Sequence, residues 1–288
     1  MILRSYLFVP GDSARKMARA VDSGADALIL DLEDSVAPAR KAEARAEVAA
    51  FLARPDVPMK RYVRVNALSC GLTADDVAGT GAGAPDGYVL PKCEGPRDVE
   101  ALSALMAEHC ANPGADIMAI ATETVRAVRS LMRHDWSHPR LGALCWGGED
   151  LAADIGAERN RDETGAYHGV FGLARDLTLL AAVEAGIAAV DAVYTDIGDD
   201  DGLMRETRQA KELGFSGKLA IHPRQIPLIH EGLRPSDAQI AWAEAVVAAF
   251  AQSGSGTLSL NGEMIDRPHL IRARKILGLR ARPSDAAS

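Results

Sequence analysis

The chain has 288 residues, which is enough for one large domain with a sizeable core. Its 48% hydrophobic and 25% charged residues are typical of a globular protein, and no stretch of roughly 18 uninterrupted apolar residues predicts a membrane span. A formal net charge of −8, without a run of Lys or Arg, argues against nucleic-acid binding, so an anionic ligand must meet a local basic cluster.

The four cysteines are Cys70, Cys93, Cys110 and Cys145, and none of them forms a CxxC pair. This spacing argues against both a structural zinc site and a disulfide framework. The N-terminal residues also lack the basic, apolar and small-residue pattern of a signal peptide. We therefore expect a protein of the reducing cytoplasm.

Short apolar runs alternate with helical patterns along the chain, which is the order expected for a parallel sheet covered by helices. The predicted strands are Ser5–Gly11, Ala27–Asp34, Tyr62–Asn66, Gly87–Lys92, Ile117–Glu123, Leu141–Asp150, Ala192–Asp196 and Lys218–Pro223. Helices are predicted between them, for example over Ala39–Leu52, Pro96–His109, Gly169–Gly186 and Asp199–Leu213. Eight strands favour an α/β fold of the (β/α)₈ TIM-barrel type over an open sheet.

The C-terminal part of the chain is longer than closure of a barrel requires. After a further predicted helix, Asp237–Gln252, a Gly/Ser hinge is expected at Ser253–Gly256. We therefore predict a catalytic barrel over residues 1–252 and a hinge with a C-terminal helical lid over residues 253–288.

The residues at the carboxyl ends of the predicted strands are candidates for the site, because active sites lie at that end of such a barrel. They are Pro10 and Gly11, Asp31 with Glu33 and Asp34, Arg64 with Asn66, Lys92, Glu123, Glu149 with Asp150, Asp196, and His222. So many carboxylates in one region require a positive charge among them. Hard oxygen ligands favour Mg²⁺ or Mn²⁺ in that place.

Several of these acids have a second interpretation. Asp34 or Asp196 alone fits the N-cap of the following helix as well as a ligand role. Glu123 ends an apolar run and is a poor N-cap, so its position favours metal ligation. The Gly147-Gly148 pair lets backbone approach a bound ion or oxyanion closely, but it also fits any tight turn.

Three basic residues stand near the predicted mouth of the barrel. Arg64, between Val63 and Val65, requires an anion if it is buried, either a structural carboxylate or a substrate carboxylate. Arg15 and Lys16 follow the first strand, where they fit a phosphate site or a solvated helix face.

A set of motifs carries a family resemblance from about Leu7 to Phe250. The motifs are LFVPGDSARKMARAVDSGADALILDLEDSV, RVN, LPK, TET, GGEDLAADIGA and AVDAVYTDIGDDDGLMRETRQAKELGFSGKLAIHPRQI. Together they resemble the citrate lyase β-subunit-like group within the HpcH/HpaI aldolase and citrate lyase superfamily. The resemblance implies a TIM barrel that binds Mg²⁺ and cleaves or forms a carbon–carbon bond in a hydroxyacyl thioester, usually of coenzyme A.

The resemblance also implies roles for individual residues. Glu123 and Asp150 resemble the metal ligands, and Arg64 resembles the arginine that contacts substrate oxygens. Glu33 and Asp34 resemble acids that hold metal-bound water and neighbouring cations. Coenzyme A contacts are expected at Phe8, Pro10, Arg15 and Lys16, and further substrate contacts at Gly148 and Glu149.

The C-terminal segment NGEMIDRPHL matches a segment that covers a neighbouring subunit's site in the coenzyme-A-using members. Asp266 is the aspartate at that place, and it implies a general acid/base that crosses a subunit boundary. We therefore expect a homotrimer or a hexamer. Trp146, where the family often has Phe, and the segment YHGVFGLARDL depart from the family pattern near the pocket.

The leading hypothesis is a Mg²⁺-dependent lyase that cleaves a carboxylated 3-hydroxyacyl-CoA, of the malyl-CoA or citramalyl-CoA type, to acetyl-CoA and a 2-oxoacid. Three other enzymes fit the same residues: a malyl-CoA thioesterase, a citrate lyase β subunit acting on an acyl-carrier-protein thioester, and a class II pyruvate aldolase. A metabolite-binding barrel without turnover is the alternative from a different class.

Overall fold

The computed structural model describes residues 3–253 and 257–278. Contacts divide them into two compact units, one over Leu3–Gly232 and a second that begins at Leu233. Residues 254–256 of the predicted hinge lie outside the described residues. Helix α10 (Asp237–Ser253) belongs to the second unit.

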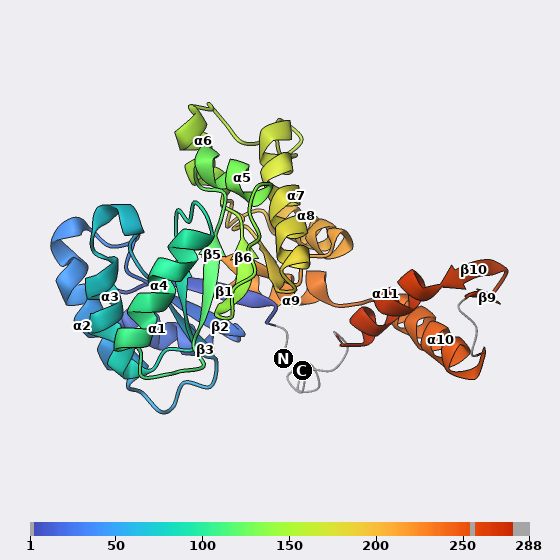
Figure 1. The fold of residues 1–288 in the computed structure, drawn as a ribbon, viewed down its shortest axis with the longest axis horizontal. Coiled ribbons are helices and arrows are strands. Elements are labelled where there is room, and N and C mark those ends of the chain that lie inside the picture. The colour runs from blue at the N-terminus through green and yellow to red at the C-terminus, as the bar shows by residue number, and fades with distance from the viewer. Residues whose placement is uncertain (1–2, 254–256, 279–288) are drawn as a thin grey trace. The chain divides into compact units, whose positions relative to one another are not determined.

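The first unit is a closed barrel of eight parallel strands in the order β1 to β8, which confirms the predicted TIM barrel (Figure 1). Its strands are β1 Ser5–Pro10, β2 Ala27–Asp31, β3 Lys60–Arg64, β4 Gly87–Leu90, β5 Asp116–Ile120, β6 Leu141–Cys145, β7 Ala188–Asp191 and β8 Gly217–Ala220. Its helices are α1 Ala14–Ala20, α2 Lys41–Leu52, α3 Thr73–Thr80, α4 Pro96–His109, α5 Val125–Leu131, α6 Gly148–Ile155, α7 Gly169–Glu184, α8 Asp200–Leu213 and α9 Gln225–Leu233.

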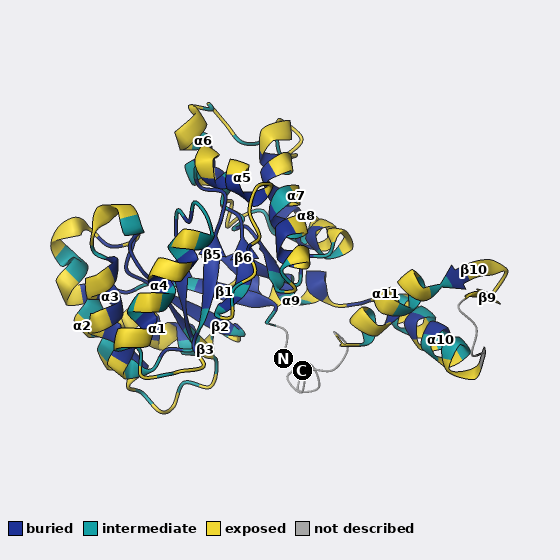
Figure 2. Ribbon diagram, in the orientation of Figure 1, coloured by how far each residue is buried: buried dark blue, intermediate teal, exposed yellow. Residues whose placement is uncertain are grey.

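The strands form the buried centre of this unit. Alternate strand residues fill the barrel interior, which packs Tyr6, Ile29, Tyr62, Met118 and Leu219 with other apolar side chains. Helices α1 to α4 cover one side of the barrel and α7 and α8 cover the opposite side. Figure 2 shows the buried strands and the exposed outer faces of the helices. Because the interior of the barrel is filled, the active site is expected at the carboxyl ends of the strands.

The seventh strand differs from its prediction. It spans Ala188–Asp191, whereas the predicted Ala192–Asp196 follows it without regular structure. The predicted strand begins after Asp191, because a buried aspartate is not expected within a strand. In the structure Asp191 ends the strand, and its side chain is fully buried. Its carboxylate is balanced by Lys218, whose Nζ lies 2.7 Å from Oδ2, and this tertiary pairing has no local sequence pattern.

The sixth strand is shorter than predicted because a helix begins inside the predicted range. Strand β6 ends at Cys145, and α6 begins at Gly148 with Gly147 at its N-cap. Glu149 and Asp150 therefore lie in the first turn of α6. Negative side chains are favourable at that end of a helix.

The second unit contains α10 (Asp237–Ser253), the antiparallel hairpin β9 (Thr257–Leu260) and β10 (Glu263–Asp266), and α11 (Arg267–Gly278). Its small core is Ala243 and Val246 of α10, Ile265 of β10 and Ala273 of α11. Asn261 and Gly262, with φ of 52° and 86°, form the two-residue turn of the hairpin. The predicted helical lid thus also contains a hairpin.

None of the helices within the described residues combines the length and the apolar composition needed to cross a bilayer.

Candidate active site

The acids of the LDLED motif and Arg64 meet at the carboxyl ends of β2 and β3. Asp31 and Arg64 are partners in the register of these parallel strands. Arg64 donates from Nε and Nη2 to the two oxygens of Asp31, both at 2.7 Å. Its guanidinium lies 4.8 Å from the centre of the Phe8 ring. This mostly buried arginine, with a side chain 11% exposed, therefore has a structural carboxylate as its main partner.

This pairing sets the protonation states of both groups. Burial alone would raise the pKa of Asp31, but the bonds from Arg64 outweigh it and hold that pKa below its ordinary value. Burial likewise opposes the charge on Arg64, yet Asp31 raises the pKa of the guanidinium. The pair is a fixed ion pair at the floor of the site.

Glu33 joins Arg64 to Lys92. Its Oε2 lies 2.9 Å from Arg64 Nη1, and its Oε1 accepts a hydrogen bond from the Lys92 ammonium. Burial raises the pKa of Glu33, although both cations oppose this effect. Asp34 is exposed, and its oxygens lie 3.8 Å from both Arg64 and Lys92.

Lys92 follows β4 and contacts acids through both its backbone and its side chain. Its φ of 50° is the left-handed conformation that non-glycine residues rarely adopt. Its backbone N–H donates to Glu123 Oε2, while its Nζ lies 3.4 Å from Asp150 Oδ1. One residue thus links the acids after β2, β5 and β6.

Glu123 is a buried acid of this cluster whose pKa is strongly raised. It is only 4% exposed, and burial together with the charge of Asp150 raises its pKa to about 8. Gly147 lies against it, since a Cβ at this position would be 3.1 Å from Glu123 Cγ. The turn is fixed by Thr122, whose Oγ1 accepts from the Gly147 N–H at 2.9 Å.

The donor set fits a divalent cation. Among the described residues, ion pairs and charge interactions connect five carboxylates (Asp31, Glu33, Asp34, Glu123 and Asp150) to two cations, Arg64 and Lys92. No three Asp, Glu, His or Cys side chains of the described residues form a complete metal cage. Mg²⁺ needs no such cage, because it is often held by one or two carboxylates and keeps several waters. Glu123 and Asp150 therefore fit a Mg²⁺ site, whose charge would favour the ionised form of Glu123.

The residues predicted to contact the substrate and coenzyme A differ in how far they are exposed. Gly148 is buried, whereas Glu149 is exposed and accepts a hydrogen bond from Asn160 at 2.7 Å. Phe8 and Pro10 are half-buried at the end of β1. Arg15 and Lys16 are exposed on α1, which begins after the N-cap Ser13.

Asp266 lies in the second unit, at the end of β10. Its Oδ1 is 2.6 Å from His269 Nδ1, and its backbone N–H donates to the same ring nitrogen at 3.2 Å. Its side chain is 34% exposed. The predicted acid/base is therefore accessible and has a histidine partner.

Some polar residues at strand ends have structural roles instead. Asn66 is buried and donates to Leu32 O and Asp76 Oδ2. Asp196 is exposed and accepts from the Gly198 N–H, and His222 accepts from the Arg224 N–H. The sequence places Lys92 at a strand end, but no function was predicted for it. Its position in the LPK motif, one of the motifs that carry the family resemblance, is the signal that could have indicated a role.

Comparisons with known proteins identify the family of this chain. Residues 4–223 match the HpcH/HpaI aldolase/citrate lyase family. A mitochondrial citramalyl-CoA lyase from Mus musculus is 33% identical, over 96% of this chain and 85% of the relative. A citrate lyase subunit beta-like protein from Mycobacterium tuberculosis is 38% identical, over 94% of this chain and 93% of the relative.

Two further relatives are informative. A (3S)-malyl-CoA thioesterase from Cereibacter sphaeroides is 33% identical, over 95% of this chain and 93% of the relative. The crystal structure of the CitE protein from Mycobacterium tuberculosis, in complex with magnesium, acetoacetate and coenzyme A, superposes with a TM-score of 0.79. That structure is 34% identical and covers 96% of this chain and 97% of its own. The family resemblance and the prediction of an enzyme are thus confirmed, and the chain belongs to the HpcH/HpaI aldolase/citrate lyase family.

Proposed function

We propose that the protein is a Mg²⁺-dependent carbon–carbon lyase that cleaves a carboxylated 3-hydroxyacyl-CoA to acetyl-CoA and a 2-oxoacid. The observation that carries this proposal is the buried Glu123, with its raised pKa, beside Asp150 at the mouth of the barrel. A relative named citramalyl-CoA lyase supports the substrate class of malyl-CoA or citramalyl-CoA type. We retain the predicted cytoplasmic location as part of the proposal.

Glu123 and Asp150 would hold the ion. Bound Mg²⁺ would act as a Lewis acid, lowering the pKa of the substrate hydroxyl and polarising the carbonyl of the 2-oxoacid. Glu33 and Asp34, held by Arg64 and Lys92, would orient water and cations around the carboxylate pair. The close ion pairs of Glu33 with Arg64 and Lys92 restrict the orientation of the Glu33 side chain.

The bond cleavage moves charge toward the thioester. Asp266 would take the proton of the hydroxyl as the carbon–carbon bond breaks. The hydroxyl oxygen would become the carbonyl oxygen of the 2-oxoacid, and the electron pair of the broken bond would move to the thioester carbonyl. Arg64 would stabilise the oxygen that gains charge, an effect of about 3 kcal/mol for one such donor. Asp266, with His269 as its partner, would deliver a proton to the acetyl carbon.

The coenzyme A part of the substrate requires local cations on an acidic protein. Arg15 and Lys16 are exposed beyond the end of β1 and would pair with its phosphates. Phe8 and Pro10 would line the path from these cations to the acids, with Gly148 and Glu149 across the site. Together they would direct the thioester toward Glu123.

The first experiment is a cleavage assay of malyl-, methylmalyl- and citramalyl-CoA with and without EDTA. We expect acetyl-CoA and a 2-oxoacid, loss of turnover with EDTA, and recovery with added Mg²⁺. Glu123→Ala should raise the Mg²⁺ requirement by orders of magnitude, with Glu100→Ala, which removes an exposed carboxylate of α4 away from the site, as the control. An unchanged Mg²⁺ dependence would remove Glu123 from the site.

A malyl-CoA thioesterase is the second candidate, because a relative of similar identity carries that name. In that reaction the same acids would direct water to the thioester carbonyl, and the products would be a free hydroxy acid and coenzyme A. Product analysis separates the two candidates, since free malate without any 2-oxoacid would contradict the lyase.

We also propose that Asp266 serves the site of a neighbouring subunit in a homotrimer or hexamer. The match of NGEMIDRPHL to the lid of coenzyme-A-using members supports this arrangement. Asp266→Asn and Arg64→Lys proteins, each inactive alone, should regain activity after mixing and subunit exchange. A mixture that stays inactive although subunits exchange would favour a site within one chain.

A further inference from the structure

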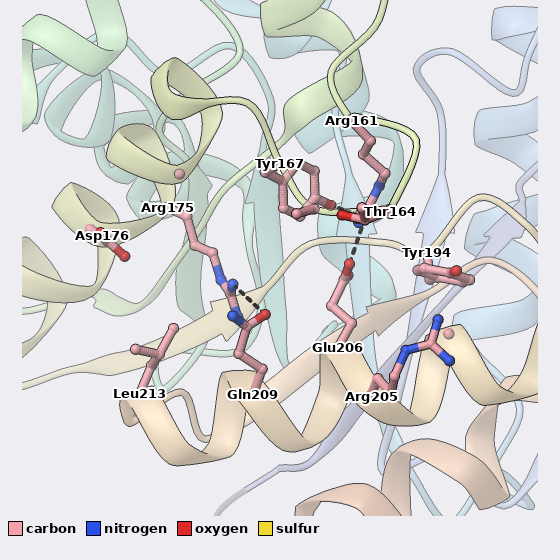
Figure 3. Close-up of a pocket in the computed structure, with 14 residues that line it drawn as sticks. Arg161, Thr164, Tyr167, Arg175, Asp176, Tyr194, Arg205, Glu206, Gln209 and Leu213 are labelled. Carbon is pink, nitrogen blue, oxygen red and sulfur yellow. Dashed lines mark hydrogen bonds and ion pairs between the residues drawn. The ribbon is translucent and has the colours of Figure 1, made fainter.

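A separate pocket of about 530 Å³ lies between α7, α8 and residues 161–167 (Figure 3). Its polar lining includes Arg161, Arg175, Arg205, Glu206 and Gln209. Tyr167 and Tyr194 supply aromatic walls. None of these residues belongs to the site around Glu123, so the pocket needs its own explanation.

Charge in and beneath this pocket does not balance. Asp191 and Glu206 share the fully buried Lys218, whose Nζ lies 2.7 Å from Asp191 and 2.8 Å from Glu206. Arg161 Nη2 adds a second cation 2.6 Å from Glu206, and Arg175 Nε adds a third 3.3 Å from Asp191. Among the residues that the structure describes, three cations therefore share two carboxylates in this mostly buried network, which leaves one positive charge in excess.

Arg175 is the cation with the least complete set of partners. It is only 5% exposed, and its Nη1 donates to the neutral Gln209 Oε1 at 3.3 Å. Among the described residues, Nε and Nη2 have no hydrogen-bond acceptor of adequate geometry. A buried guanidinium with unpaired donors is costly unless an anion completes its bonding.

The pocket also presents cations at its surface. Arg205 of α8 is exposed at the pocket and lies one helical turn before Gln209. Figure 3 shows Arg161, Arg175 and Arg205 on three different sides of the opening. The acids of the lining are Glu206, which Lys218 and Arg161 already hold, and the exposed Asp176.

We propose that this pocket binds a small oxyanion, with phosphate or carboxylate groups, between Arg175 and Arg205. Arg175 supplies the buried Nη2, which has neither an acceptor nor an ion-pair partner among the described residues, and Arg205 supplies the accessible charge at the entrance. Planar guanidinium groups bind both phosphate and carboxylate oxygens in this way. The site is independent of the proposed lyase chemistry.

Calorimetric titration of the full-length protein in zwitterionic buffer tests the proposal, with inorganic phosphate and malonate as separate probes. The probe that binds with the higher affinity shows whether the pocket prefers phosphate or carboxylate groups. Arg205→Gln should weaken binding about tenfold, because it removes a charged hydrogen-bond donor at the entrance of the pocket. Arg208→Gln is the matched control, since Arg208 is also exposed on α8 but does not line the pocket.

A second variant supplies the anion from within the chain. Gln209→Glu places a carboxylate beside Arg175, so it should raise the melting temperature in anion-free buffer and abolish saturable phosphate or malonate binding. Retention of wild-type affinity in this variant would overturn the proposal. Absence of saturable binding of either probe, or equal losses in the Arg205 and Arg208 variants, would do the same.

Discussion

Lys92 connects acids from three strands, so its charge should matter for the stability of the site. Lys92→Met would leave Glu33 with Arg64 as its remaining cation in a buried setting. We expect the free energy of unfolding to fall by about 1–3 kcal/mol at pH 7. Chemical denaturation measures this change, and Lys92→Arg, which keeps the charge, should lose less. Equal stability of the Met variant and the wild type would contradict the role of the ammonium.

Glu123 should give the metal-free protein a characteristic pH dependence. Its pKa is about 8 in the folded protein against an ordinary value of 4.5, so the folded state binds its proton more tightly than the unfolded state. The contribution to stability is present below pH 4.5 and is lost as the pH rises toward 8, at about 1.4 kcal/mol per pH unit. Urea denaturation in EDTA should show this slope.

Glu123→Gln removes this titrating group and should clearly reduce the slope between pH 5 and pH 8, while other buried carboxyls with a raised pKa, such as Glu33, keep their own contribution. Glu149→Gln, an exposed neighbour of Asp150, is the control and should leave the slope in place. If Glu123→Gln and the wild type lose stability in parallel over this range, the carboxyl of Glu123 is not the group with the raised pKa.

The roles of some site residues could be predicted from the sequence, and the roles of others could not. Glu123 stood out because a glutamate after an apolar strand is a poor N-cap. The partner of Arg64 stayed open between a protein and a substrate carboxylate, because only the register of β2 and β3 places Asp31 opposite it. The function of Lys92 depends on a left-handed backbone that its residue type does not predict.

The turn between β6 and α6 is the element that positions Asp150. Because a Cβ at Gly147 would lie 3.1 Å from Glu123 Cγ, Gly147→Ala should displace Glu123. We expect a loss of about tenfold in Mg²⁺ affinity, equivalent to about 1.4 kcal/mol. Metal titration measures this loss. Gly169→Ala is the control, since an added Cβ there meets nothing within 4 Å, and a loss of equal size would refute the steric argument.

Other elements show where local patterns succeed and where they do not. Most strands of the barrel were found because their apolar runs are local and strongly patterned. Strand β7 was displaced in the prediction because it ends in Asp191, whose burial depends on Lys218 of another strand. The β9–β10 hairpin was missed although Asn261-Gly262 is a strong signal for a two-residue turn.

At the scale of the whole molecule, the charge network of Asp191 ties several elements together. Lys218 comes from β8, Arg175 from α7 and Trp146 from the turn after β6, and all three contact its carboxylate. Asp191→Asn should lower the free energy of unfolding by about 3–5 kcal/mol, because it leaves buried cations without their counter-charge. Thermal and chemical denaturation measure this loss.

Asp22→Asn, which removes an exposed carboxylate of the same barrel, should change stability little and serves as the control. A cost for Asp191→Asn as small as that of the Asp22 variant would show that the network carries no net stability. The sequence could not predict this network, since its members are separated along the chain and meet only when the barrel closes.

Closure of the barrel has a consequence for association between molecules. Strands β1 and β8 pair with each other, so every strand of the barrel has neighbours on both sides and presents no free edge. Within the described residues, open edges remain on the two-stranded sheet of β9 and β10. Exposed strand edges are the sites where chains add strands to one another. Fibril formation or strand exchange should therefore start from this hairpin.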